Sequence, residues 1–390
     1  MGRRAMTNYA KTIWLDGEAG AFETFLQEVS RVTNARDWPL AAEIAQGVPV
    51  YDGAYVRKVA PLKEKRQALM AEWATALAAG PGAIAIKGAM ADLDALNEAT
   101  AIFDAIIEEE KAAGAGAGDH FAKTGANDRI WNALEKHCLK DPANFARYYA
   151  SDALAMAAEA WLGRGYQMTA QVNRVNPGGA AQTPHRDYHL GFMSPAQMAA
   201  FPSHIHRISP LLTLQGAVAH CDMPKETGPT MLLPYSQQFF EGYLAFARAP
   251  FQAYFAEHHA QLPLETGDAL FFNPALMHGA GSNVTKDRQR MANLLQVSSA
   301  FGRAMESVNR SAMIKALYPG LVELDGTARD NVIAASAEGY SFPTNLDCDP
   351  PLGGLAPKSQ ADLTRDALAV GMEREAFARM IDEADARKKP

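Results

Sequence analysis

The chain has 390 residues, of which 48% are hydrophobic and 21% charged, and its formal net charge is -7. These values are typical of a globular protein, and the net charge gives no basic footprint, so a nucleic-acid partner is disfavoured. The three cysteines, Cys138, Cys221 and Cys348, lie far apart, so we expect no disulfide framework and no cysteine zinc site. No apolar run approaches the ~18 residues of a membrane span, so we expect a cytoplasmic protein that binds neither nucleic acid nor membrane.

The first part of the chain, up to about residue 162, is patterned mainly as helices. Apolar residues recur at helical spacing over 61–80, 92–114 and 141–163, and each stretch predicts one helix. Between the first two, the sequence GAIAIKG at 82–88 alternates like a short strand. The small residues at 113–118 predict a flexible loop.

Short strands take over beyond residue 162. They are predicted from apolar or alternating stretches that Gly and Pro turns separate: 166–179, 208–223, 228–236, 264–274 and 290–301. Because no helical stretch lies between successive strands in a regular βα rhythm, the pattern favours an antiparallel sandwich or barrel. Beyond residue 303 the chain is helical and loop-like, with a linker at 345–359 and one terminal helix over 362–389.

The stretch TPHRDYHLGF places His185 and Asp187 two residues apart in an extended segment. Residues at this spacing point to the same face of a strand, so both side chains could bind one metal ion, while Arg186 points the other way. His189 lies one further step along the same face. A polar strand on a solvated sheet face would produce the same triplet, so a second cluster has to decide.

That second cluster begins at His278, which follows an apolar strand and a Pro-containing turn. Two arginines, Arg288 and Arg290, come shortly after it. Two imidazoles and one carboxylate, with open positions left on the metal, are the ligands of non-haem Fe(II) oxygenases. An arginine fork can bind the carboxylate of an organic co-substrate through two hydrogen bonds. A zinc hydrolase remains an alternative, since Zn(II) accepts the same three ligands.

Over residues 82–302 the chain resembles the phytanoyl-CoA dioxygenase family of Fe(II)- and 2-oxoglutarate-dependent oxygenases. The stretch LETGDALFFNPALMHGAGSNVTKDRQRMANLLQVSSAF is the most specific part of the resemblance. It implies a mainly β core with flanking helices, built as a double-stranded β-helix (jelly roll). This domain would lie between an N-terminal helical extension, 1–81, and a C-terminal helical extension, 303–390.

The resemblance also implies a role for each residue of the two clusters. His185, Asp187 and His278 would bind the iron. Arg290 would hold the distal carboxylate of 2-oxoglutarate, because it leads directly into an apolar strand as the family's arginine does. Arg288 is its rival, since the family's arginine usually falls at position 289, which is Gln289 here.

Three glutamines are further candidates for contacts with 2-oxoglutarate: Gln171, Gln182 and Gln215. Each could instead satisfy main-chain groups. His189 could face the substrate. The family often has Ser or Thr two residues after the second histidine, where this chain has Ala280.

The implied cofactors are Fe(II), 2-oxoglutarate and O2. The implied reaction is hydroxylation of an unactivated C–H bond of a small organic substrate, with release of succinate and CO2. Asp187 favours this outcome over halogenation, since related halogenases have a small residue there. A homo-oligomer is one possible assembly. The alternatives are a cupin-like metal enzyme that does not use 2-oxoglutarate and a non-catalytic jelly-roll metal-binding protein.

Overall fold

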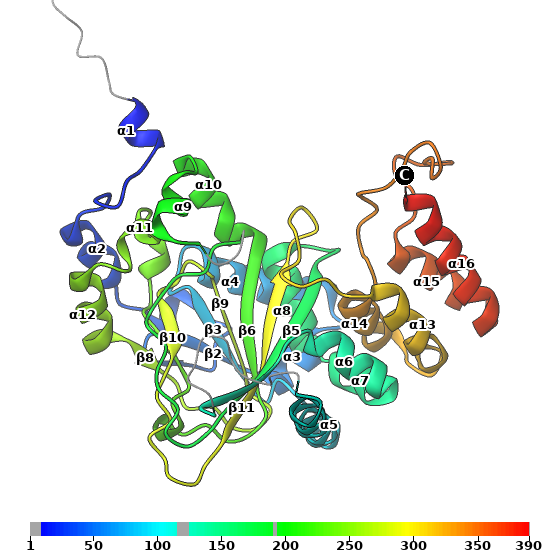
Figure 1. Ribbon diagram of the computed structural model, residues 1–390, viewed down its shortest axis with the longest axis horizontal. Helices are drawn as coiled ribbons and strands as arrows, with labels where there is room; N and C mark the ends of the chain where they lie inside the picture. Colours follow the sequence, from blue (N-terminus) through cyan, green and yellow to red (C-terminus); the bar gives the residue numbers. More distant parts are fainter. Residues whose placement is uncertain (1–8, 115–124, 190–192, 390) are drawn as a thin grey trace, which may run out of the picture.

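Two β-sheets lie at the centre of the molecule and helices surround them (Figure 1). The computed structural model describes residues 9–114, 125–189 and 193–389. The stretch predicted as a flexible loop, 113–118, lies largely outside these residues. Within the described part of the chain, no helix combines the length and the apolar character needed to cross a membrane.

The larger sheet has eight strands in the order β1-β2-β3-β9-β6-β11-β5-β4. All neighbours pair antiparallel except β2 and β3, which are parallel. The strands are β1 (Glu43–Ala45), β2 (Val48–Asp52), β3 (Ala83–Lys87), β4 (Asn127–Ile130), β5 (Gln167–Val175), β6 (Thr213–Ala219), β9 (Ala269–Phe272) and β11 (Arg290–Ser298). The smaller sheet has the order β10-β7-β8 and consists of β7 (Thr230–Leu232), β8 (Ala260–Gln261) and β10 (His278–Ala280).

The two faces of the larger sheet have different neighbours. Ala217 and Ala292 share one apolar cluster with Leu232 of the smaller sheet, so this face points into the space between the sheets. Leu295 and Val297 alternate with that face and belong to a second, larger cluster formed with the helices. This arrangement confirms the prediction of a mainly β core with flanking helices, in the form of a jelly roll.

The N-terminal region contributes strands as well as helices. Its β1 and β2 extend the larger sheet beyond β3. Its helices are α1 (Tyr9–Ile13), α2 (Phe22–Val29), α3 (Gly53–Val59) and α4 (Lys63–Ala78). The predicted domain limits, 1–81, 82–302 and 303–390, remain predictions.

Helices α5 (Leu93–Ala112), α6 (Ala133–Lys140), α7 (Pro142–Tyr149) and α8 (Asp152–Leu162) belong to the second cluster, behind the larger sheet. The prediction of one helix over 141–163 is wrong, because the helix ends at Tyr149 and a new one begins at Asp152. Between them Ser151 is non-helical, and its hydroxyl donates to the carbonyl of Ala89 at 3.0 Å. A contact with a distant segment therefore divides a continuous helical pattern.

Four short helices lie at the same end of the molecule as α2 (Figure 1): α9 (Pro195–Ala199), α10 (Ser203–Ile208), α11 (Gly242–Ala245) and α12 (Ala249–His258). The rings of Phe25 and Phe251 lie 4.9 Å apart, which packs α2 against α12. Phe239, in the turn before α11, joins the same apolar cluster.

The C-terminal helices lie at the opposite end of the molecule (Figure 1): α13 (Arg310–Leu321), α14 (Gly326–Ser336), α15 (Gln360–Ala369) and α16 (Arg374–Lys388). The prediction of one terminal helix is wrong, because α15 ends at Ala369 and Gly371 has a φ of 61°. Glycine adopts this left-handed conformation without steric cost and commonly ends helices. The rings of Tyr318 and Phe377 stack at 3.8 Å and pack α16 against α13.

Two histidines are buried behind the larger sheet and are kept neutral there. His220 shares hydrogen bonds with the Thr100 hydroxyl at 2.8 Å and the Tyr148 hydroxyl at 2.9 Å. His137 pairs with the side-chain oxygen of Asn144 at 2.7 Å. Burial lowers the pKa of His220 to about 3 and that of His137 to about 4.

The buried imidazoles predict that acid destabilises the fold. In the unfolded chain both histidines take up protons near pH ~6.5, whereas in the folded chain they do so only at much lower pH. The contribution of the two neutral imidazoles to stability is therefore complete above the unfolded-state pKa of ~6.5 and is lost as the pH falls toward 4. In urea titrations across this range, the free energy of unfolding should decline less steeply for His220→Gln than for the parent chain. Equal slopes would contradict the assignment.

Candidate metal centre

The structure brings the three predicted ligands together. His185 Nε2 lies 3.5 Å from Asp187 Oδ1, and His278 Nε2 lies 3.6 Å from Asp187 Oδ2. One potential ligand atom from each residue lies within 4.8 Å of the other two. The two imidazole rings are 4.6 Å apart, and His278 is buried.

A short antiparallel pairing produces this geometry. The main chains of His185 and His278 exchange two hydrogen bonds, of 2.8 and 3.0 Å. Two residues further on, the Asp187 N–H donates to the Pro274 carbonyl at 3.0 Å. The segment that carries His185 and Asp187 therefore lies alongside β10 and the turn before it.

The orientation of both imidazoles leaves Nε2 free to bind a metal ion. His185 Nδ1 lies 2.9 Å from the Thr183 carbonyl, and His278 Nδ1 lies 2.7 Å from the Leu276 carbonyl. A carbonyl only accepts hydrogen bonds, so Nδ1 carries the proton and the neutral ring presents a lone pair at Nε2. Two such nitrogens facing one carboxylate form a set of acceptors with no donor among them, and this set fits a cation.

The local electrostatics keep these groups in the forms that bind metals. Burial by itself would raise the pKa of the Asp187 carboxyl, but imidazolium charge beside it in acid, together with the Gln215 amide donor, outweighs burial and holds that pKa well below its usual range. Burial, and then the neighbouring ring of His278, lowers the pKa of His185. At neutral pH the site thus offers a carboxylate and, at position 185, a neutral imidazole.

Three further side chains support the ligands. The Gln215 amide nitrogen donates to Asp187 Oδ2, and the Tyr243 hydroxyl donates to the Asp187 main-chain oxygen at 3.0 Å. The ring of Phe272 packs 4.7 Å from that of His278. Sequence reasoning selected Gln215 as a co-substrate contact, whereas its amide nitrogen is bound to a predicted ligand. It missed Tyr243 and Phe272, for which no local signal exists.

The two candidate arginines differ sharply in their surroundings. Arg290, the first residue of β11, is 5% exposed, and its Nη1 is buried without a hydrogen-bond partner in the described residues. Burial lowers the pKa of Arg290 to about 10, so the guanidinium is still charged at neutral pH. Arg288 is exposed. A buried charge with an unused donor is suited to an anionic ligand, so burial favours Arg290 over Arg288.

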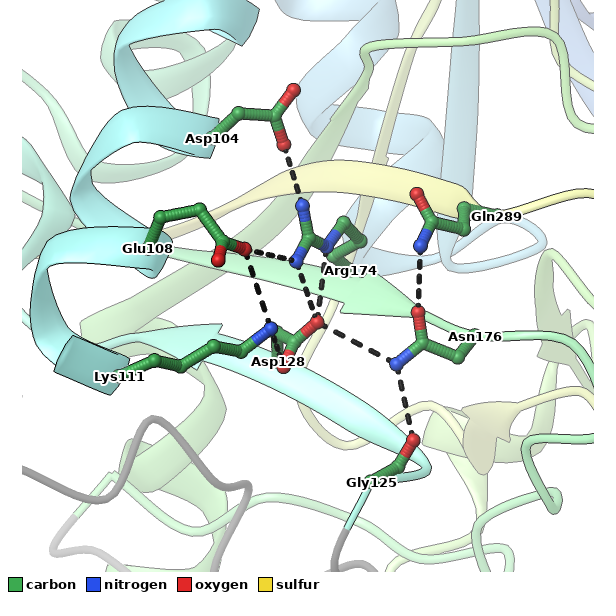
Figure 2. Close-up of polar contacts among 8 residues, drawn as sticks. All are labelled: Asp104, Glu108, Lys111, Gly125, Asp128, Arg174, Asn176 and Gln289. Atoms are coloured by element: carbon green, nitrogen blue, oxygen red, sulfur yellow. Dashed lines mark hydrogen bonds and ion pairs between the residues drawn. The ribbon is translucent and has the colours of Figure 1, made fainter. Parts of the chain in front are cut away.

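A charged network holds the strands beside Arg290 (Figure 2). Arg174 on β5 donates to Asp128 on β4 at 2.8 and 3.0 Å, and to Asp104 on α5 at 2.8 Å. Asn176 accepts from the Gln289 amide at 2.9 Å, directly before the buried arginine. The network joins α5, β4 and β5 on the outer face of the sheet, so the alternate residues of these strands point inward.

The inner face of the larger sheet is polar near the three ligands. Gln296 on β11 pairs with Gln215 on β6, and Ala292 pairs with Asn173 on β5. Three side-chain oxygens on this face, those of Asn173, Gln215 and Gln296, are buried without partners in the described part of the chain. Sequence reasoning missed Gln296, although its even spacing from Arg290 along one strand places both on the same face.

The remaining candidates have protein partners. Gln171 accepts from Arg129 at 2.9 Å and donates to the Met305 sulfur at 3.7 Å. The Gln182 oxygen accepts from the Ala280 N–H at 3.1 Å, beside β10. His189 contacts the Thr213 hydroxyl at 2.6 Å, and its Nε2 accepts from the N–H of residue 303 at 3.3 Å. Their predicted roles toward 2-oxoglutarate and substrate remain predictions.

The sequence matches the family model described as "Phytanoyl-CoA dioxygenase (PhyH)" over residues 66–292, more than half of the chain. The chain is also 30% identical over 141 residues to "Dioxygenase aneA" of Aspergillus aculeatus. That alignment covers 36% of this chain and 42% of the relative, so the chain spans less than half of the relative's length. The family match confirms the resemblance that the sequence motifs indicated, and with it the predicted class of enzyme at the level of the family.

Solved structures with a similar course of the chain include two enzymes of nogalamycin biosynthesis. One is the α-ketoglutarate-dependent epimerase SnoN, which is 18% identical; the match covers 64% of this chain and 82% of that chain, with a TM-score of 0.39. The other is the α-ketoglutarate-dependent carbocyclase SnoK, which is 17% identical; the match covers 65% of this chain and 90% of that chain, with a TM-score of 0.42. A third solved structure is HygX from Streptomyces hygroscopicus with nickel and 2-oxoglutarate bound, which is 14% identical. The match covers 57% of this chain and 84% of that chain, with a TM-score of 0.37.

The contact between Gln215 and Asp187 predicts that the amide tunes metal affinity. Substituting Gln215→Leu should weaken Co(II) binding about tenfold, since outer partners of metal ligands typically matter by this factor. Gln261→Leu is the matched control, because Gln261 is also buried and donates to the Pro229 carbonyl at 2.8 Å, but it lies on β8. Titration calorimetry should show weaker binding for the first variant alone, and equal affinities would contradict the role of Gln215.

Proposed function

Because the chain belongs to the phytanoyl-CoA dioxygenase family, we propose that it is an Fe(II)- and 2-oxoglutarate-dependent dioxygenase that hydroxylates an unactivated C–H bond of a small organic substrate. The observation that carries the proposal is the set of three facing acceptors formed by His185, Asp187 and His278. Neutral imidazole and carboxylate ligands suit Fe(II), and three of them leave positions open for other molecules.

Each group of the site has a distinct task in this proposal. The Nε2 atoms of His185 and His278 and the carboxylate of Asp187 would hold the iron. With 2-oxoglutarate and O2, the bound iron supplies the oxidation that yields succinate, CO2 and the alcohol. Gln215 fixes the Asp187 carboxylate through its Oδ2 atom, so that the ligand does not rotate away from the two imidazoles.

Arg290 binds the distal carboxylate of 2-oxoglutarate. Its buried guanidinium lies at the start of β11, on the face of the sheet that also carries Gln215 and Gln296. A desolvated arginine gains more from a two-bond contact with a carboxylate than an exposed one does. The unpartnered oxygens of Asn173 and Gln296 accept hydrogen bonds from the substrate on the same face.

The rival functions leave parts of the site without a task. A cupin-like metal enzyme that ignores 2-oxoglutarate, or a metal-binding protein without activity, gives the buried charge of Arg290 no anion. A zinc hydrolase needs a general base close to the metal, and among the described residues no further His, Cys, Asp or Glu joins the three ligands in a group of ligand atoms within 4.8 Å. The cytoplasmic location and the homo-oligomer remain part of the proposal.

The central test is turnover of 2-oxoglutarate by the full chain with Fe(II), ascorbate and O2. Succinate should form slowly without a second substrate, and faster with the correct member of a panel of small organic metabolites, which should gain one oxygen atom. Neither binding nor turnover of 2-oxoglutarate in any mixture would contradict the proposed function.

Substitution of the two arginines should separate their roles. Arg290→Met should raise the KM for 2-oxoglutarate by about 100-fold, because a lost charge-assisted contact is worth ~3 kcal/mol. Arg290→Lys should recover part of the loss, since an ammonium keeps the charge but not the fork. The exposed Arg288→Met is the control and should leave that KM unchanged. The opposite order of effects would assign the co-substrate to Arg288.

A further inference from the structure

Arg186 is a buried arginine between two predicted metal ligands. It follows His185 and precedes Asp187, points to the opposite side of the segment, and is 5% exposed. Its Nη1 donates to the Phe239 carbonyl at 3.0 Å, and its Nη2 donates to the Ser236 carbonyl. The guanidinium lies 5.7 Å from the centre of the Tyr243 ring. The guanidinium therefore contacts the turn before α11 and the start of that helix.

No carboxylate of the described residues forms an ion pair or hydrogen bond with Arg186, although the charge of Glu241 favours the guanidinium from further away. Nη1 and Nη2 donate to the two main-chain carbonyls, the guanidinium faces the Tyr243 ring, and the buried Nε has no hydrogen-bond partner among the described residues. Burial lowers the pKa of Arg186 to about 10, so it remains charged at neutral pH. A buried charge that donates only to carbonyls and leaves one donor unpaired costs more than an apolar side chain of the same volume would. Stability is therefore a weak explanation for an arginine at this position.

The segment 236–243, which Arg186 contacts, is also bonded to the chain just before His278 on β10. The Ser236 hydroxyl oxygen accepts from the Met277 N–H at 2.7 Å, and the Leu233 N–H donates to the Met277 carbonyl at 2.9 Å. Met277 directly precedes His278. On the other side, the Tyr243 hydroxyl donates to the Asp187 carbonyl at 3.0 Å. The segment thus touches both ligand-bearing parts of the chain.

Gly242 shows how closely the guanidinium is packed. A Cβ atom at position 242 would lie 1.8 Å from Arg186 Cζ and 1.9 Å from its Nη1. No side chain larger than hydrogen fits there unless the guanidinium moves.

The N-terminal region supports this segment from outside. The Phe239 ring lies 5.6 Å from that of Phe25 on α2 and stacks on that of Phe251 on α12 at 5.8 Å. Arg248 donates to the carbonyl of Ala19 at 3.0 Å and to that of Gly20 at 2.6 Å. Because the segment is packed on its outer side, a displaced guanidinium would push against the ligand-bearing strands.

We propose that Arg186 is a positioning residue: its guanidinium fixes the segment 236–243 and thereby sets the distance between the Asp187 and His278 side chains that a metal ion requires. We call Arg186, Ser236, Phe239, Gly242 and Tyr243 the arginine clamp. The inference rests on the proposed metal centre and deepens it, since it assigns a task to the residue between two of the ligands.

The test compares metal affinity in two buried-arginine variants of the full chain. Arg186→Met keeps most of the apolar stem and removes the donors. Arg310→Met is the matched control, because Arg310 is also buried and donates to two carbonyls, of Met168 at 2.8 Å and Ala335 at 3.4 Å, but it lies on α13. Co(II) binding is measured by titration calorimetry in the absence of 2-oxoglutarate, and thermal unfolding is recorded for each variant.

Thermal unfolding checks that each variant is folded, and only Arg186→Met should bind Co(II) at least about tenfold more weakly. Arg186→Lys should recover part of that affinity, since one ammonium donor can reach the Ser236 carbonyl. Unchanged affinity in a folded Arg186→Met variant, or an equal loss in Arg310→Met, would overturn the clamp alone. A parent chain that binds no Co(II) would overturn the metal centre, and the clamp with it.

A double-mutant cycle between positions 186 and 242 tests the packing of the guanidinium directly. Gly242→Ala should weaken Co(II) binding in the parent chain, because the new Cβ displaces the guanidinium. In the Arg186→Met background the same substitution should have a smaller effect, and the difference measures the coupling between the two positions. Additive effects would show that position 242 acts independently of Arg186 and would count against the clamp.

Discussion

The site depends on two main-chain hydrogen bonds between His185 and His278. These bonds join segments that are far apart in the sequence, and they place two imidazoles and the carboxylate of Asp187 within reach of one ion. Because main-chain pairing fixes Cα positions and directions, the ligand geometry does not depend on flexible side chains alone. The jelly roll supplies this pairing, since one ligand-bearing strand belongs to the smaller sheet and the larger sheet faces it.

One half-buried carboxylate and two buried guanidinium groups then give the site its chemistry. The pKa of Asp187 lies well below its usual range although burial opposes this, and the Gln215 amide donates to its carboxylate. Arg290 has a buried Nη1 without a hydrogen-bond partner in the described residues, and Arg186 donates through Nη1 and Nη2 to main-chain carbonyls behind the ligands. A charge removed from water requires a partner, so each of them specifies what has to lie beside it. In the proposed function these partners are a metal cation for Asp187 and the 2-oxoglutarate carboxylate for Arg290, whereas Arg186 has a turn of the chain itself.

Local patterns predicted most elements but not their ends. The alternation at 82–88 became β3, and the helical spacing at 61–80 became α4. Two predicted helices were each divided, one where Ser151 bonds to Ala89 and one at Gly371. A hydrogen bond to a distant carbonyl leaves no trace in helical periodicity. A single glycine is also a weak signal, because glycines occur within helices as well as at their ends.

The sequence by itself predicted the candidate ligand set, because a period of two along a strand places His185 and Asp187 on one face and because His278 follows an apolar strand. It also limited the candidates for an anion-binding arginine to Arg288 and Arg290. Only the tertiary structure decided that Arg290 is buried while Arg288 is exposed, that Gln215 bonds to Asp187, and that Arg186 holds a turn more than fifty residues downstream. Burial and contacts between distant segments arise when strands and helices pack, and local periodicity does not encode them.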